Sequence, residues 1–455
     1  MQSVETQAIT KSTSPSTWMV IKRDGAQFKF HEYKIKAALA QLALAEADQD
    51  KVIDALEDQL AALSEISTIA ISKILVKVLR DFGFDQAADA YLAYRHQDVL
   101  DWEHQVDPVQ RINRLVANED TLVHENANKD SKVFNTQRDL TAGAVGKTVG
   151  LKLMPEHVAK AHVRGDIHYH DLDYTPLSPM TNCCLIDFKE MLTNGFKIGN
   201  AEVESPKSIQ TATAQMAQII ANVASSQYGG CSADRVDEVL KPFAKCNYEK
   251  HLKESADFIE DPDKQKAFAI KRTKKDIYDA MQGLEYEINT LFSSQGQTPF
   301  TTLGFGLGTS WIAREIQKAI LQVRIEGLGK EKRTAIFPKL VFTIKKGLNY
   351  APDEPNYDIK QLAVECATKR MYPDVLMYDK IIELTGSFKA PMGCRSFLQG
   401  WWDENGREVN SGRMNLGVVT INLPRIAMES HGDVDLFWEI LGERLQVAKD
   451  ALKFK

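Results

Sequence analysis

The sequence contains few cysteines, and none of its six belongs to a Cys-x-x-Cys pair. A four-cysteine zinc site is therefore not expected within this chain, because such sites are built from closely spaced cysteine pairs. Six thiols in 455 residues are also too few for a disulfide scaffold. At least some of them are expected to be free thiols in a reducing compartment.

Long hydrophobic runs are also missing. No apolar stretch approaches the roughly 20 residues needed to cross a bilayer, and the polar N-terminus lacks the apolar core of a signal peptide. The formal charge of −6 argues against nonspecific nucleic-acid binding. With 44% hydrophobic and 26% charged residues, the composition is that of a soluble globular protein. We expect a cytoplasmic protein with neither a nucleic-acid nor a membrane partner.

One of the cysteines, Cys394, lies in a segment that predicts a tight turn between two short strands. The segment Pro-Met-Gly-Cys-Arg-Ser-Phe, residues 391–397, predicts a strand-turn-strand finger with Cys394 at its tip. Far upstream, the segment Asn-Cys-Cys-Leu-Ile-Asp at residues 182–187 contributes Cys183, and Asn415 follows the finger. A thiol held at the tip of a finger is positioned to react. We expect the thiols of Cys394 and Cys183 and the amide of Asn415 to converge.

With these residues the sequence resembles the anaerobic, class III ribonucleotide reductases, glycyl-radical enzymes that convert ribonucleoside triphosphates to 2′-deoxy products. The resemblance runs almost from end to end. It includes the segments Asn126–Lys132, Arg164–Asp171, Gly296–Phe300, Pro338–Phe342 and Asn422–Arg425. Each match is short, but so many in the right order are specific.

The resemblance implies a role for each residue of the predicted site. Cys394 would carry the thiyl radical that abstracts the 3′ hydrogen of the ribose, Cys183 would donate hydrogen and a proton toward C2′, and Asn415 would hydrogen-bond near the ribose hydroxyls. The finger has no carboxylate after Cys394. This favours the type that uses formate as the reductant and an S-adenosylmethionine-dependent activase.

Three other patterns have structural interpretations. Cys184 follows Cys183, and since neighbouring side chains of a strand alternate, it is expected to point away as a small buried residue. The run His168–Asp173 has alternating potential metal ligands, but we interpret it as hydrogen-bonded wall residues and predict no metal. The segment Gly304–Thr309 lacks the third glycine of a dinucleotide-binding loop and predicts a strand entering a helix.

The first 105 residues predict a separate regulatory domain. After a flexible tail over residues 1–16, a hairpin around Asp24-Gly25 and four amphipathic helices follow within residues 17–105. This segment resembles the ATP-cone, the regulatory module of many ribonucleotide reductases. Lys22, Arg23 and Lys34 are the residues expected to bind the phosphates of ATP or dATP. The alternative is a solvated basic edge strand.

Residues 106–455 have an α/β pattern. Long amphipathic helices are predicted over Ala212–Ser225 and Ile277–Phe292, and buried strands over Val341–Ile344, Val375–Met377 and Val418–Ile421. By resemblance, this region is an incomplete ten-stranded reductase barrel with the finger threaded through its centre. A helix pair would be available for homodimer contact.

The chain departs from the family at its end. The family continues into the rest of the barrel, a zinc site and a glycyl-radical loop, whereas this sequence ends at Lys455. We expect the chain alone to lack reductase activity and a glycyl-radical signal, and to need a C-terminal half in trans. The alternatives are an inactive nucleotide-binding regulatory remnant and, disfavoured by the finger sequence, a cobalamin-dependent reductase.

Overall fold

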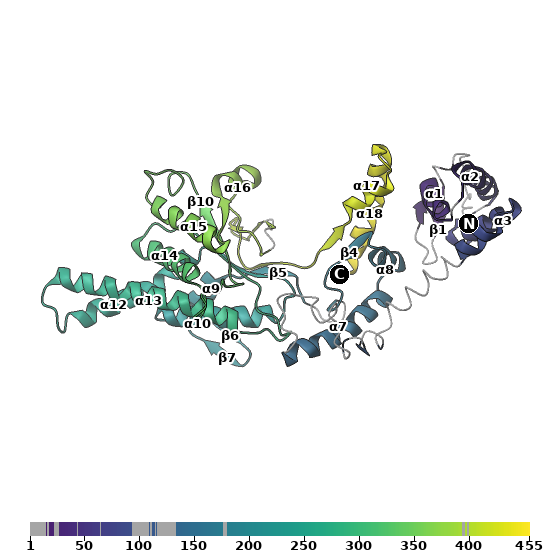
Figure 1. The fold of residues 1–455 in the computed structure, drawn as a ribbon. Coiled ribbons are helices and arrows are strands. Elements are labelled where there is room, and N and C mark those ends of the chain that lie inside the picture. The colour runs from purple at the N-terminus through teal and green to yellow at the C-terminus, as the bar shows by residue number, and fades with distance from the viewer. Residues whose placement is uncertain are drawn as a thin grey trace, which may run out of the picture. The chain divides into compact units, whose positions relative to one another are not determined.

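The computed structural model describes residues 18–21, 27–42, 44–63, 65–92, 133–175, 180–393, 396–397 and 400–455, with residues 15, 109, 112, 113 and 115. The chain divides into two compact units (Figure 1). Unit 1 comprises residues 1–113, 144–177 and 418–455, and unit 2 comprises residues 114–143 and 178–417. No helix in the described ranges is long and apolar enough to span a membrane.

The N-terminal part of unit 1 has the predicted hairpin and helices. Its elements are β1 (Met19–Ile21), β2 (Gln27–Lys29), α1 (Glu32–Ala40), α2 (Glu46–Ala61), β3 (Ile66–Ser67) and α3 (Thr68–Asp81), and residues 85–92 are also helical. The hairpin β1–β2 is antiparallel, as expected, while β3 adds a parallel strand that the sequence did not predict. Leu39, Leu56 and Leu75 are fully buried where the helices meet, which accounts for the helical periodicity of the leucines.

The remainder of unit 1 joins two distant chain segments. It contains the end of α7 (Phe134–Leu153), then α8 (Glu156–Val163), β4 (Ile167–Tyr169), β15 (Val419–Ile421), α17 (Leu423–Glu429) and α18 (Val434–Phe454). Strands β4 and β15 form a two-stranded antiparallel sheet. Val447 and Ala451 of α18 pack with Tyr169 of β4 in one buried cluster, so the C-terminal helix is held by its apolar face.

Unit 2 is built on a six-stranded sheet. Its strand order is β11 (Asp374–Met377), β10 (Lys339–Ile344), β9 (Thr301–Phe305), β8 (Cys231–Ala233), β5 (Cys183–Leu185) and β14 (Arg413–Asn415). Neighbouring strands are parallel except for β14, which is antiparallel to β5. Each parallel connection contains a helix, as such crossovers require. The fold is therefore mixed α/β, as predicted.

The helices of unit 2 cover one face of this sheet. Cys184, Cys231 and Phe305 point to this face and pack in a single core with Met216 of α10 and Ile277 of α13. The other elements of the unit are α9 (Phe188–Asn194), β6 (Phe196–Ile198), β7 (Ala201–Val203), α10 (Ile209–Ala224), α11 (Val236–Val239), α12 (Lys241–Ser255), α13 (Pro262–Thr290), α14 (Trp311–Glu326), α15 (Tyr357–Arg370), α16 (Tyr378–Thr385), β12 (Trp401–Trp402) and β13 (Glu408–Val409).

Helix α13 is longer than its periodicity predicted. It begins at Pro262, after Asp261, whose carboxylate accepts a hydrogen bond from the Asp263 amide at 2.9 Å. An N-cap aspartate followed by proline is a strong helix start. Its N-terminal half is basic and largely exposed, and the helix packs against α12 (Figure 1).

Two strand predictions need correction. Strand β11 was expected to be buried, but Val375 and Met377 are exposed because β11 lies at the sheet edge with one neighbouring strand. Strand β15 is only partly buried and pairs with β4 rather than joining the six-stranded sheet. By contrast, β10 is buried along most of its length, as predicted.

Candidate active site

Two residues of the predicted site lie side by side in the sheet. Strand β14 pairs with β5 so that Asn415 stands directly opposite Cys183. The Asn415 carbonyl accepts a hydrogen bond from the Asn182 amide at 2.8 Å, and the Asn415 side-chain oxygen accepts one from the Gly417 amide at 3.0 Å. The register of one antiparallel pair thus brings together a thiol and an amide that are far apart in the sequence.

The Cys183 thiol is buried and fixed by two hydrogen bonds. Its Sγ donates to Asn182 Oδ1 at 2.9 Å and accepts from the Gly230 amide at 3.3 Å. A Cβ at Gly229 would lie 2.5 Å from this sulfur, so only glycine fits there. The pair Gly229-Gly230 was not recognised from the sequence. Its signal is two glycines directly before a buried strand.

Cys184 points to the opposite face, as the alternation predicted. Cys184 packs in the helix-covered core, whereas Cys183 clusters with Leu185, Ala390 and Met392. Cys184 is the register partner of Cys231 on β8. Hydrogen bonding to Cys184 and burial raise the pKa of the Cys231 thiol well above its ordinary value, so Cys231 is a protonated packing residue.

The finger lies on the same sheet face as Cys183. Pro391 and Phe397 form an antiparallel bridge, and the Met392 amide donates to the Ser396 carbonyl at 2.8 Å. Met392 is fully buried in the cluster with Cys183. Cys394 lies outside the described residues, so its convergence with Cys183 stays a prediction. The described residues before and after it support a chain reversal over this face.

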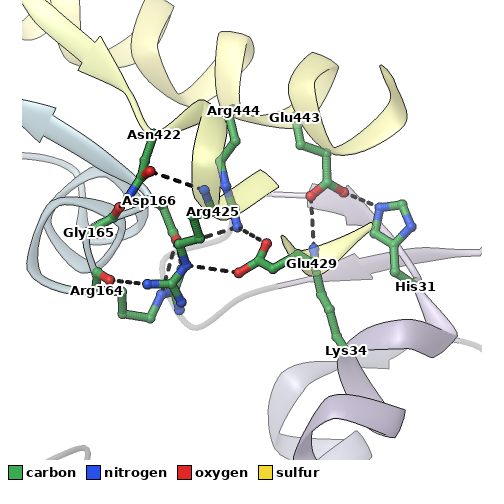
Figure 2. Close-up of polar contacts among 10 residues, drawn as sticks. All are labelled: His31, Lys34, Arg164, Gly165, Asp166, Asn422, Arg425, Glu429, Glu443 and Arg444. Atoms are coloured by element: carbon green, nitrogen blue, oxygen red, sulfur yellow. Dashed lines mark hydrogen bonds and ion pairs between the residues drawn. The ribbon is translucent and has the colours of Figure 1, made fainter. Parts of the chain in front are cut away.

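Of the three predicted effector residues, only Lys34 lies within the described residues, and Lys22 and Arg23 lie outside them. Lys34 extends from α1 to α18, where its Nζ lies 2.8 Å from Glu443 Oε2. His31 contacts the other oxygen of Glu443 (Figure 2). Burial opposes ionisation of this carboxyl, but the hydrogen bond from His31 and the charge of Lys34 prevail and lower the pKa of Glu443 to about 2. Lys34 is thus engaged by a protein carboxylate.

Acidification is expected to weaken the contacts of Glu443. Because folding lowers its pKa from 4.5 to about 2, the stabilisation is complete above the unfolded pKa of 4.5 and is lost as the pH falls toward 2. Wild type should therefore unfold at a higher temperature than Glu443→Gln near neutral pH, and the difference should shrink between about pH 5 and pH 3. Thermal unfolding across this range measures it. A difference that does not change with pH would contradict the assignment.

In the segment Arg164–Asp171, the Asp166 side chain forms buried ion pairs with arginines. The Asp166 carboxylate is 1% exposed and meets three guanidinium groups, from Arg164 at 2.9 Å, Arg425 at 3.2 Å and Arg444 at 3.3 Å (Figure 2). Among the described residues, no group of three or more histidine, cysteine or acidic side chains is arranged to hold a metal ion. Through its contacts with Arg425 and Arg444, Asp166 anchors the start of β4 to α17 and α18.

The histidines of this region pack on one another. The rings of His162 and His168 are 5.3 Å apart, and those of His168 and His170 are 4.4 Å apart. His162 Nδ1 accepts a hydrogen bond from the Tyr169 amide at 3.1 Å. Burial, together with the charge of His168, lowers the pKa of His162 to about 4. This ring is therefore neutral near pH 7 and can pack against the ring of His168.

These features define a class of protein. It is an α/β protein in which a buried thiol and an amide lie opposite each other on adjacent strands, on the sheet face that a finger segment covers. Comparison with known proteins gives the family. Residues 125–455 match the family model "Anaerobic ribonucleoside-triphosphate reductase", and residues 18–99 match the ATP cone domain. The chain belongs to the anaerobic ribonucleoside-triphosphate reductase family.

Curated relatives agree with this assignment. The chain is 53% identical over 440 residues to the anaerobic ribonucleoside-triphosphate reductase of Salmonella typhimurium and 52% identical over 440 residues to that of Escherichia coli. Each match covers 95% of this chain and 62% of the relative. A third relative, from Enterobacteria phage T4, is 54% identical over 342 residues, which cover 73% of this chain and 55% of that protein. The chain thus spans about 62% of the length of the bacterial relatives.

Solved structures show the same fold. Two structures of the anaerobic ribonucleotide reductase from Thermotoga maritima, one with glycerol and one with citrate in the active site, each align with a TM-score of 0.53. Their sequence identities are 19% and 17%. The first alignment covers 77% of this chain and 58% of the solved chain, and the second 81% and 66%.

Proposed function

We propose that this chain forms part of an enzyme that reduces ribonucleoside triphosphates to 2′-deoxyribonucleoside triphosphates. The overall reaction joins one ribonucleoside triphosphate, one formate and one proton to give the deoxy product, carbon dioxide and water. Formate is oxidised and C2′ is reduced by two electrons. The observation that supports this most is the register pairing of Asn415 with Cys183 on the face that the finger covers.

Each residue of the proposed site has a role in one step of the reaction. A thiyl radical on Cys394 takes the hydrogen from C3′, forming an S–H bond as the C–H bond breaks. The 2′-hydroxyl then leaves as water with a proton from the Cys183 thiol, and the 3′-hydroxyl gives its proton to the resulting thiolate, which leaves a keto group at C3′ and a radical at C2′. Asn415 orients the sugar hydroxyls through an amide that can donate and accept without a fixed charge. The Asn182 oxygen, 2.9 Å from the sulfur, holds the Cys183 hydrogen in a defined direction.

Other parts of the proposal come from the family resemblance. They are a complete ten-stranded barrel, a glycyl radical and a zinc site in a further region, an S-adenosylmethionine-dependent activase, and a homodimer. In this proposal a C-terminal half, if encoded separately, acts in trans. The test is anaerobic incubation of the complete reductase with activase, formate and CTP, with dCTP and the electron paramagnetic resonance signal measured together. An absence of dCTP beside retained nucleotide binding would favour the alternative, an inactive regulatory remnant.

We propose further that residues 17–105 bind ATP or dATP as allosteric effectors through Lys22, Arg23 and Lys34. The match to the ATP cone domain and the self-contained core of this segment support this. In the structure Lys34 is paired with Glu443. A phosphate and this carboxylate would compete for the same ammonium group, so effector binding would loosen the contact between α1 and α18.

Removal of a lysine charge from this site is expected to weaken ATP binding. Lys22→Ala and Lys34→Ala should each raise the Kd by about tenfold, the usual effect of one charge-assisted hydrogen bond. Glu443→Gln should lower the Kd, because it frees Lys34 from its partner. Isothermal titration calorimetry measures all three. Lys51→Ala is the control, since Lys51 is an exposed lysine on α2 that pairs with Asp48.

A folded sample that binds no adenine nucleotide would remove the regulatory assignment. If Lys34→Ala binds ATP as wild type does while Lys22→Ala does not, Lys34 is a docking residue for α18 and not an effector ligand.

A further inference from the structure

Two buried hydroxyl groups in the six-stranded sheet have no hydrogen-bond partner among the residues that the structure describes. They are Ser232 Oγ on β8 and Thr302 Oγ1 on β9, in residues that are 1% and 2% exposed. Buried hydroxyls are usually hydrogen-bonded, and leaving one unpaired destabilises a fold. Two such groups side by side indicate a function that offsets this loss.

The two hydroxyls belong to one row across the sheet. Leu185, Ser232, Thr302 and Lys339 are successive register partners on β5, β8, β9 and β10. Partners in register point to the same face, and Leu185 shares its face with Cys183, two residues before it. The Nζ of Lys339 lies 4.2 Å above the ring of Phe300, two residues before Thr302. The row therefore lies on the same sheet face as Cys183, and Lys339 places a positive charge on the strand next to Thr302.

The finger covers this row. A Cβ at Gly393, the residue before Cys394, would lie 3.0 Å from the Phe300 ring and 3.4 Å from Thr302 Oγ1. Met392 packs in the cluster with Cys183 and Leu185. The unpaired hydroxyls thus lie next to the finger, in a row that is one two-residue step of about 7 Å along the strands from the row of Cys183. Ser232 is one strand and Thr302 two strands across the sheet from β5.

We propose that Ser232 and Thr302 bind the 5′-phosphate side of the ribonucleoside triphosphate, with Lys339 supplying charge. This rests on the proposed reductase function. Hydroxyl donors beside an ammonium group suit phosphate oxygens. With this offset along the strands and the spacing of about 5 Å between neighbouring strands, Ser232 and Thr302 lie roughly 8 and 12 Å from Cys183, which is comparable to the reach of a 5′-triphosphate chain from the sugar carbons. The substrate completes the hydrogen bonds of both residues, so they position the ribose over Cys183 and Asn415.

The substitution that isolates the Thr302 hydroxyl is Thr302→Val, made in the complete, activated reductase. It is expected to raise the KM for CTP about tenfold, the effect of one hydrogen bond to a charged group, and to leave the midpoint of thermal unfolding unchanged or slightly higher. Ser232→Ala, which removes a single oxygen atom, is the second variant and should raise the KM similarly.

The matched control lies on the same strand. Thr301 is also buried, but it points to the helix-covered face with Cys231, and its Oγ1 donates to the Pro299 carbonyl at 3.1 Å. Thr301→Val should lower the unfolding midpoint and leave the KM for CTP unchanged. The two threonines thus separate substrate binding from stability.

Competition by cytidine tests the phosphate assignment. Thr302→Val should weaken the binding of CTP. It should leave the inhibition constant of cytidine unchanged, because cytidine has no phosphate. An equal loss for cytidine would overturn the phosphate assignment. If wild type reduces CTP while Thr302→Val and Ser232→Ala both keep its KM, the inference is wrong and the proposed function stands. If wild type does not reduce CTP, the proposed function fails and this inference fails with it.

Discussion

Cys183→Ser is expected to abolish dCTP formation, reducing it by at least about a thousandfold in the complete, activated reductase, a loss of more than about 4 kcal/mol in transition-state stabilisation. Serine preserves the shape of the side chain and can still donate to Asn182 Oδ1, which accepts from Cys183 Sγ at 2.9 Å. Its O–H bond is too strong to exchange hydrogen with a carbon radical. The loss should therefore be chemical, with CTP binding retained. Anaerobic turnover and CTP binding, measured on the same preparation, distinguish the two.

Cys184→Ser is the control for this substitution. Cys184 lies on the opposite face, in the helix-covered core, beside Cys231. A hydroxyl there costs about 1–2 kcal/mol of stability, but substantial turnover should remain. If Cys184→Ser loses turnover and Cys183→Ser keeps it, the assignment of the reacting thiol is wrong.

The parts of the site that follow from local pattern could be predicted from the sequence. The alternation of side chains along a strand predicted that Cys183 and Cys184 lie on opposite faces of the sheet. The hairpin around Asp24-Gly25 and the leucine faces of α1 and α2 were also predicted. These features depend on residues within a few positions of one another. The same reasoning failed for β11, because a run of apolar residues does not reveal whether a strand has one neighbour or two.

Contacts between distant segments could not be predicted. The two-residue strand β3 exists only because β1 lies next to it, and the pair of Lys34 with Glu443 joins residues that are 409 positions apart. The unpaired hydroxyls of Ser232 and Thr302 became visible only when the register showed that they are neighbours. Asp166 lay within a segment that was recognised, yet two of its three arginine partners, Arg425 and Arg444, come from the distant helices α17 and α18.

That carboxylate supports the largest stability effect we expect. Asp166 is almost fully buried, and its Oδ2 accepts from Arg164 while its Oδ1 contacts Arg425 and Arg444 (Figure 2). The geometry at Oδ1 is that of ion pairs and not of hydrogen bonds. Glu429 also pairs with Arg425 and Arg444, at 2.9 and 3.2 Å, so a loss of Asp166 would leave them partly compensated.

Asp166→Asn should accordingly destabilise the protein by about 2–4 kcal/mol, somewhat less than the full loss of one partner from a buried ion pair. Asparagine has the same size, so the effect is that of the charge and not of a cavity. The exposed Asp435 in the first turn of α18 provides the matched control, and Asp435→Asn should cost no more than about 0.5 kcal/mol. Urea unfolding followed by circular dichroism gives both values. Equal stabilities of the two variants would mean that Glu429 alone satisfies the arginines and that Asp166 does not hold β4 to the C-terminal helices.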